Sequence, residues 1–264
     1  MKKCFILLTG MFLYACNNGD GSKTASESKV MYRDLDSENL KGDISSYEET
    51  PYKTDSTGKI GEMDSCCATT TDYDENGNAS KSVSKDSKGT VSSESALSRH
   101  PNGMFKSVAN TAKGKSTGGF ETKLDDNGKV NWAEGTDSNG KLDIYYTNIS
   151  QNEVGEVTGW KQFDKDSEFR ESGENKYEGH RFLENTTKDS VGKVKSSTMP
   201  KYNEKGEQIE FSNTTVGKDS TTTKVTKYTY ETHDDMGNWT QRTTWDDKGK
   251  ATAIAKRSYT YRKK

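Results

Sequence analysis

Short polar turns that end in glycine interrupt runs of strand-forming residues from about residue 41 to the end of the chain. The runs are rich in Thr, Ser, Tyr, Val and Lys, and the Asp or Asn that opens most turns can bond to the backbone ahead of it. The glycine then supplies the positive φ that closes the turn, so the pattern predicts hairpins. The turns are Asp55–Gly58, Asp74–Gly77, Asp86–Gly89, Pro101–Gly103, Asp125–Gly128, Asp137–Gly140, Asp189–Gly192, Asn203–Gly206, Asp234–Gly237 and Asp246–Gly249.

The spacing of these turns makes one hairpin the repeating unit. Alternate glycines are 25 or 26 residues apart, as between Gly77, Gly103 and Gly128. Consecutive antiparallel strands form a meander, whereas parallel strands would need crossovers of about a dozen residues or more. We therefore predict an all-β antiparallel meander of about 14 to 18 strands over residues 41–264, as a curved open sheet or an incompletely closed barrel.

Residues of similar type recur at alternate positions within the strands, but this alternation is irregular. Tyr228 and Tyr230 fall on one face of their strand, and the pattern places Trp239 and Trp245 on a common face of the next. Pairs of aromatic and β-branched residues across strands contribute about 0.2–1 kcal/mol each. Such pairs could stabilise a sheet that has little aliphatic core. No segment shows convincing helical periodicity.

Composition supports a folded chain with a thin core. Hydrophobic residues are 28% and mean hydropathy is -1.08, which favours disorder. The 13 Tyr, 4 Trp and 8 Phe argue against disorder, as do only 3 Pro. The formal charge of -2 with 30% charged residues excludes the basic stripe of a nucleic-acid binder, so we expect no nucleic-acid partner.

The first forty residues differ from the rest. Residues 1–15 have a basic start and a short apolar run, too short to span a bilayer and typical of an export signal. The residues before Cys16 resemble the lipobox of bacterial lipoproteins, which implies cleavage after Ala15 and a lipid anchor on Cys16, including palmitate or a similar acyl chain. Residues 16–40 then form a polar tether, although Val30 to Leu40 could instead be a loosely docked segment. Asn17 lacks the inner-membrane retention signal known from enteric bacteria, so the expected location is the outer membrane, on either side of it.

The C-terminal segment, residues 228–261, has a tyrosine-bearing strand, a D-D-x-G-N-W turn, a polar strand and a D-D-x-G-K turn. It resembles the YD-repeat (Rhs-like) β-sheet lipoproteins of Bacteroidetes, as do residues 40–61 and the YDENGN unit at Tyr73. Residues 90–220 match only loosely. The resemblance implies a β-sheet envelope protein with no catalytic residues to transfer. The Lys-rich strands are also similar in style to the outer surface lipoproteins of spirochaetes.

The sequence contains few candidates for metal-binding or catalytic residues. Asp72, Asp74, Asn76 and Gly77 fit the start of a calcium loop, but Val83 stands where the bidentate acid would be, and hairpin chemistry explains the same residues. The histidines, His100, His180 and His233, show no metal-ligand spacing. Cys66 and Cys67 are either chance thiols or a strained, redox-active bridge. No catalytic motif, metal or cofactor is predicted.

The tryptophans are the remaining candidates. Trp132, Trp160, Trp239 and Trp245 could present flat faces to sugar rings, or they could form cross-strand pairs within the sheet. The leading hypothesis is a non-catalytic, lipid-anchored envelope lipoprotein that presents a repetitive surface for binding or structural use. The alternative is a glycan-binding module. Its partners would be the membrane, through the N-terminal lipid, and a polysaccharide or another envelope protein.

Overall fold

The structure is a computed structural model that describes residues 33–55, 57–64 and 67–263. This part of the chain has one short helix, α1, Asp34–Ser37, and 17 strands, within the predicted range. The strands are β1 Ile44–Thr54, β2 Ile60–Met63, β3 Ala68–Tyr73, β4 Ala79–Lys85, β5 Val91–Arg99, β6 Phe105–Ala112, β7 Lys115–Leu124, β8 Val130–Thr136, β9 Leu142–Gln151, β10 Val157–Asp164, β11 Phe169–Glu178, β12 Arg181–Lys188, β13 Val194–Tyr202, β14 Gln208–Val216, β15 Thr221–His233, β16 Trp239–Trp245 and β17 Ala251–Tyr261.

The hairpin turns form as the sequence predicts. In the turn after β3, Gly77 N–H donates to the Asp74 carbonyl at 3.0 Å, and Asp74 Oδ1 accepts the N–H groups of Asn76 and Asn78 at 2.9 Å each. The φ of Gly77 is 79°, a value that a side chain would oppose. The carboxylate of Asp74 therefore organises its own turn. The same bonds recur in the turns opened by Asp86, Asp125, Asp137, Asn152, Asp164, Asp189, Asn203, Asp234 and Asp246.

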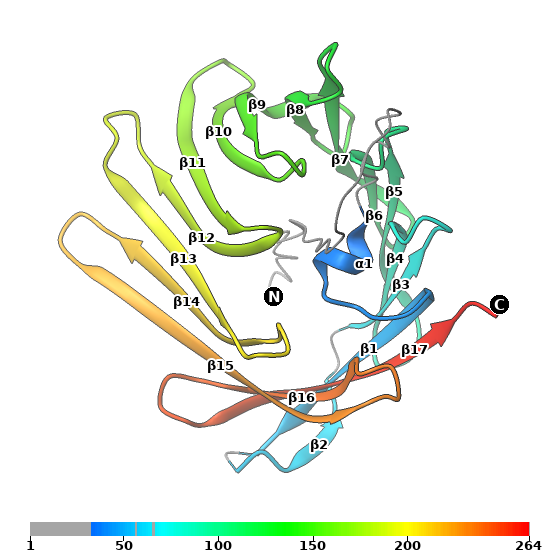
Figure 1. The fold of residues 1–264 in the computed structure, drawn as a ribbon. Coiled ribbons are helices and arrows are strands. Elements are labelled where there is room, and N and C mark those ends of the chain that lie inside the picture. The colour runs from blue at the N-terminus through cyan, green and yellow to red at the C-terminus, as the bar shows by residue number, and fades with distance from the viewer. Residues whose placement is uncertain (1–32, 56, 65–66, 264) are drawn as a thin grey trace, which may run out of the picture.

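The sheet closes into a barrel, so the prediction of an open sheet or incompletely closed barrel is wrong. Each strand from β3 to β17 pairs antiparallel with the next, and β1 pairs with both β3 and β17 (Figure 1). Sixteen strands thus form the ring, while β2 pairs with the end of β1. The closing register runs from Ile44 opposite Tyr261 to Tyr52 opposite Ile254. Pairing between residues about two hundred positions apart produces the closure, which local turn spacing does not encode.

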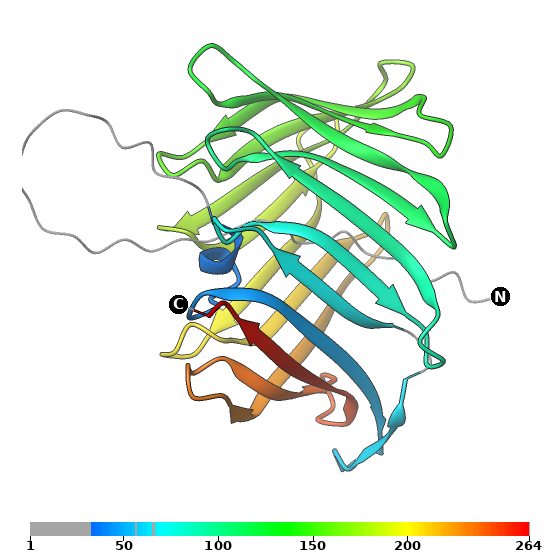
Figure 2. The same ribbon diagram turned by 90° about the vertical axis from the view of Figure 1, so that its right-hand side faces the viewer.

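A short N-terminal segment lies inside one end of the barrel. We call residues 33–41 the plug; they comprise α1 and the residues around it. Figure 2 shows α1 and the C-terminal end of β17 at the same end of the barrel. Leu35 is fully buried and Leu40 is 7% exposed, in a cluster with Ile44, Tyr73 and Ala79. Residues 33–40 are the described part of the Val30 to Leu40 segment, for which the sequence leaves tether and docked segment open, and these residues are docked.

The position of the plug shows which face of the barrel wall points into the lumen and which points outward. Tyr47 and Tyr259 pack against the plug cluster and lie opposite each other in the closing register. Side chains alternate between faces along a strand, so Glu49 and Arg257, which also pair, share the lumen side with them. The outer side of β1 and β17 carries Glu48 opposite Ser258 and Lys256 opposite Thr50. Both faces of this wall are therefore largely polar.

Candidate functional site

Asp34 of the plug is the centre of a buried polar contact with the first hairpins. Its Oδ2 accepts the N–H of Ala79 at 2.7 Å and pairs with Arg99 of β5. Its own N–H donates to Asn78 Oδ1 at 3.1 Å. Burial raises the pKa of Asp34, and Arg99 opposes that rise. These bonds join the plug to β4 and β5.

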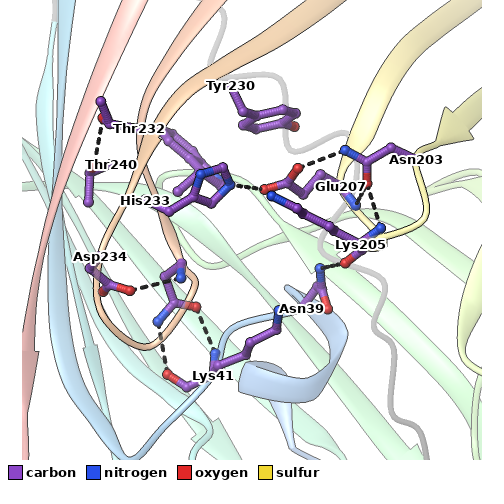
Figure 3. A network of polar contacts seen from close by, with 12 residues as sticks. Asn39, Lys41, Asn203, Lys205, Glu207, Tyr230, Thr232, His233, Asp234 and Thr240 are labelled. Atoms are coloured by element: carbon purple, nitrogen blue, oxygen red, sulfur yellow. Dashed lines mark hydrogen bonds and ion pairs between the residues drawn. The ribbon is translucent and has the colours of Figure 1, made fainter.

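On the opposite side the plug is held by two later turns (Figure 3). Lys41 N–H donates to Asn238 Oδ1 at 2.8 Å, and Asn238 Nδ2 donates back to the Lys41 carbonyl at 2.9 Å. Asn39 Nδ2 donates to the Lys205 carbonyl at 3.0 Å. The plug thus contacts hairpins that lie 166 and 197 residues away from it in sequence. Since one Asn238 side chain satisfies both backbone groups of Lys41, this contact fixes where the plug ends.

Beside these turns lies a polar group around Glu207, drawn in Figure 3. Its carboxylate is 8% exposed and bonds to His233 Nε2 through Oε1. Asn203 Nδ2 donates to Oε2 at 2.7 Å. Glu207 therefore joins the turn between β13 and β14 to the end of β15. His233, one of the histidines noted in the sequence, has a structural partner here.

A second buried acid lies near the plug, at the start of β10. The Glu156 side chain is 0% exposed, and its Oε1 lies 3.3 Å from His180 Nδ1, while Oε2 has no hydrogen-bond partner. Burial, with a smaller contribution from Asp34, raises the pKa of Glu156 to about 9. Burial also lowers the pKa of His180. Both side chains are accordingly neutral near pH 7 in the folded protein.

The lumen wall near the plug carries stacked arginines. The Arg257 guanidinium lies 4.3 Å from the ring centre of Tyr47 and 4.2 Å from that of Trp239, and its Nε bonds to Glu49 at 2.7 Å. Arg242 stacks at 4.8 Å on Trp239 as well. Cation–π contacts of this kind are worth about 0.5–2 kcal/mol each. We call these residues, with Tyr228, the arginine cluster.

A row of aromatic rings crosses another part of the lumen wall, from β6 to β10. Phe105 and Phe120 are 6.1 Å apart, Phe120 and Tyr146 are 5.7 Å apart, and Tyr146 and Trp160 are 5.5 Å apart. Trp160 lies directly over Gly173, where a Cβ would come within 2.2 Å of the indole. Glycine at this position is what allows the ring to lie against the wall. Between this row and the arginine cluster, the lumen side of β11 to β14 carries Thr, Ser and Asn residues together with Glu171, Tyr177 and Phe211.

The outer face is charged and cross-paired. Lys and Glu side chains on neighbouring strands form ion pairs from β4 to β14. They are Lys81–Glu94, Lys123–Glu134, Lys176–Glu184, Lys188–Glu174 and Lys201–Glu210. Trp132, Tyr145 and Phe163 also lie on this face and stack at 4.8 and 5.3 Å with interplanar angles of 11° and 13°. Because each ring covers the face of the next, this row presents mainly ring edges to solvent.

The four predicted tryptophans do not form one surface. Trp160 and Trp239 face the lumen, whereas Trp132 and Trp245 lie on the outer face. The prediction that Trp239 and Trp245 share a face is wrong. The register pairs Gln241 with Thr232 but Trp239 with His233, so an extra residue in β16 turns Trp239 inward.

The other candidates divide between the described residues and those outside them. Ala15 and Cys16, as well as Cys66, lie outside the described residues. Cys67 is disulfide-bonded. His100 Nε2 bonds to Thr122 Oγ1 at 3.1 Å. Within residues 33–263, less the gaps given above, no three acidic, His or Cys side chains are grouped as metal ligands, and no helix is long and apolar enough to span a membrane.

Comparison with known proteins identifies a fold but no family. No family model and no curated protein matches the chain. A porin-like protein from Bacteroides uniformis ATCC 8492 has a similar structure, with a TM-score of 0.53 at 12% identity over 82% of this chain and 98% of that one. A porin-like protein from Bacteroides vulgatus ATCC 8482 covers the same shares at 13% identity with a TM-score of 0.34. A TcdB2-TccC3 structure matches at 11% identity and a TM-score of 0.19, over 76% of this chain and 15% of that one. The first match supports the all-β barrel; the others are too distant to support an argument.

Proposed function

We propose that this chain is a non-catalytic envelope lipoprotein whose barrel stands in water and is held at the outer membrane by lipid on Cys16. The observation that carries the proposal is the charged outer face. A membrane-spanning barrel has an outward apolar band about 25 Å tall, and a Lys or Arg at its centre costs about 2–4 kcal/mol. Here Lys81 and Glu94 form an ion pair near the middle of β4 and β5, and Glu184, which pairs with Lys176, lies near the middle of β12. A wall of this kind favours water on its outside.

The plug and the polar lumen support a binding or structural role for such a barrel. Barrels of sixteen or more strands are wide enough to enclose an aqueous interior. The described wall offers hydroxyl, amide and aromatic groups to that interior. The plug, fixed by Asp34 and Asn238, joins the barrel to the preceding residues, which lead to the proposed anchor.

Replacement of Cys16 with Ser tests the anchor and the water-exposed wall together. The variant should leave the membrane fraction and retain its β-sheet circular dichroism in buffer without detergent. The control is Cys67→Ser, which changes a cysteine in the body and should stay on membranes. A Cys16→Ser variant that still sediments with membranes after washing at high salt would contradict the proposal, because its strands would then be the attachment.

Glycan binding in the lumen is a second candidate. The row from Phe105 to Trp160 and the hydroxyl- and amide-bearing strands beside it favour this candidate. Aromatic faces with a few polar groups are the usual lining of sites for small ligands. Binding of a neutral or acidic polysaccharide should shift Trp fluorescence. Trp160→Phe should remove most of that shift, and Trp132→Phe on the outer face should leave it. No shift across a broad panel of polysaccharides would end this candidate.

A further inference from the structure

The two guanidinium groups of the arginine cluster differ in exposure and in how completely they are hydrogen-bonded. Arg257 is 13% exposed, is stacked on Tyr47 and Trp239, and has the carboxylate of Glu49 at 2.7 Å. Arg242 is 25% exposed and lies 3.9 Å from the same carboxylate, beyond hydrogen-bond length. Its Nε is buried and has no hydrogen-bond partner. Arg257 is thus fully engaged within the wall, whereas Arg242 has an incomplete set of partners.

The charges in this part of the lumen do not balance. Arg242 and Arg257 share one close carboxylate, that of Glu49. Two further acids near the cluster have partners of their own: Glu38 of the plug accepts a hydrogen bond from Tyr73 at 2.8 Å, and Glu207 bonds to His233. Among Arg242, Arg257 and Glu49 the positive charges therefore exceed the negative charges by one. Such an excess on a partly buried wall attracts an anion.

Stacking also fixes the orientation that Arg242 presents. Its guanidinium lies over Trp239 at 4.8 Å and over Tyr228 at 4.9 Å, so the rings hold the plane of the group. A guanidinium held in this way presents its N–H edge, which matches a carboxylate or sulfate in a two-bond geometry. The lumen side next to it carries hydroxyls: Thr244 lies opposite Tyr228, and Thr226 is two residues earlier on the same face.

We propose that Arg242 is the anion-binding residue of a lumen site for acidic glycans, with the negative group of one sugar residue on its N–H edge. The threonine hydroxyls beside it bind the hydroxyls of the same sugar. Trp239 and Tyr228 act as positioning residues that hold the guanidinium. This inference rests on the second candidate function, glycan binding in the lumen, and names its substrate class.

The test uses the full chain purified in detergent and three probes measured by titration calorimetry. The first is a hexamer of galacturonate, which carries one carboxylate per ring. The second is the same hexamer as its methyl ester, which removes only the charge. The third is sodium acetate at an equal concentration of carboxylate, as a free anion. The acid hexamer should bind at least tenfold more tightly than the ester, and acetate should not compete with it.

The variants separate the role of Arg242 from general effects of charge. Arg242→Gln should reduce affinity for the acid hexamer to that for the ester, and Arg242→Lys should restore part of the difference. Arg170→Gln is the matched control, because Arg170 is 53% exposed and pairs with Asp164 at the turn between β10 and β11. It should bind as the unmodified protein does. Circular dichroism of each variant checks that the barrel has formed.

Each of the other possible results of these titrations refutes a defined part of the proposal. Equal binding of acid and ester, unchanged in Arg242→Gln, would refute the acidic site but leave glycan binding in place. Competition by acetate would reduce the site to one for any small anion, which refutes the sugar assignment. Absence of binding to every glycan, neutral and acidic, would remove both the inference and the candidate function on which it rests.

Discussion

Replacement of Glu156 with Gln should change how the stability of the barrel depends on pH. In the folded protein this side chain is fully buried, its Oε2 has no partner, and its pKa is raised to about 9 from a usual 4.5. The folded state therefore holds the proton more tightly than the unfolded chain does. The bound proton therefore adds to the free energy of unfolding. This contribution is complete below about pH 4.5 and is lost as the pH rises toward about 9. A glutamine, which does not titrate, avoids that loss.

The magnitude follows from the size of the shift. At 1.36 kcal/mol per pKa unit, a change from 4.5 to about 9 sets a ceiling of about 6 kcal/mol at high pH. His180 Nδ1 lies 3.3 Å away, so the N–H of a neutral imidazole can donate a hydrogen bond to an ionised Glu156, which lowers the penalty. We expect Glu156→Gln to be more stable than the unmodified protein by about 1–3 kcal/mol at pH 9, with little difference at pH 5.

Urea unfolding followed by Trp fluorescence at several pH values between 5 and 9 measures this difference. The control is Glu153→Gln in the same turn, where the side chain is exposed. Parallel stability curves for Glu156→Gln and the unmodified protein would refute the reasoning. They would show that the buried carboxyl has the same proton affinity in the folded and unfolded states.

Three further substitutions test the plug, the lumen wall and a turn. Leu35→Ala should weaken docking of the plug by about 2–4 kcal/mol, measured as faster tryptic cleavage after Lys41; an unchanged rate would contradict the burial of Leu35. Gly173→Ala places a Cβ 2.2 Å from the Trp160 ring and should lower the free energy of unfolding by about 1–3 kcal/mol with a shift in Trp emission. Ser167, at a φ of 64°, occupies the left-handed position that glycine takes in other turns. Ser167→Gly should therefore raise the free energy of unfolding by about 1 kcal/mol, seen as a higher melting temperature. A lower melting temperature for that variant would refute this view of the turn.

The local part of the fold was predictable and the closure was not. The turns opened by Asp or Asn depend on bonds within five residues, and their glycines reveal them in the sequence. Closure depends on β1 meeting β17, where Glu49 pairs with Arg257 across a separation of 208 residues. Nothing in the spacing of turns distinguishes a sheet that meets its own first strand from one that stays open. The all-β meander was therefore confirmed, and its open form was not.

The two faces of the wall were hard to assign for a related reason. In a barrel with a large aliphatic core, alternation of apolar and polar residues shows which side faces inward. Here Ser, Thr and aromatic residues occur on both sides, as Trp160 and Trp132 illustrate. Bulges add to the problem, because one extra residue in β16 reverses the direction of Trp239 relative to Trp245. The helix of the plug was equally hard to predict, because four helical residues are too few to show a periodic pattern in the sequence.

The pairing of β1 with β17 has a consequence for how the protein is made. β1 is synthesised early and β17 last, so the edge of the first strand stays unpaired until the whole barrel sequence has been made. Arg262, just beyond β17, bonds to the Asp43 carboxylate at 2.6 Å and to the carbonyls of Tyr73 and Asp74 at 2.6 Å each. Arg262 thus completes contacts with the residue before β1 and with the turn after β3. A chain that stops before β17 would lack its closing seam, and its two exposed edges would be available to other chains.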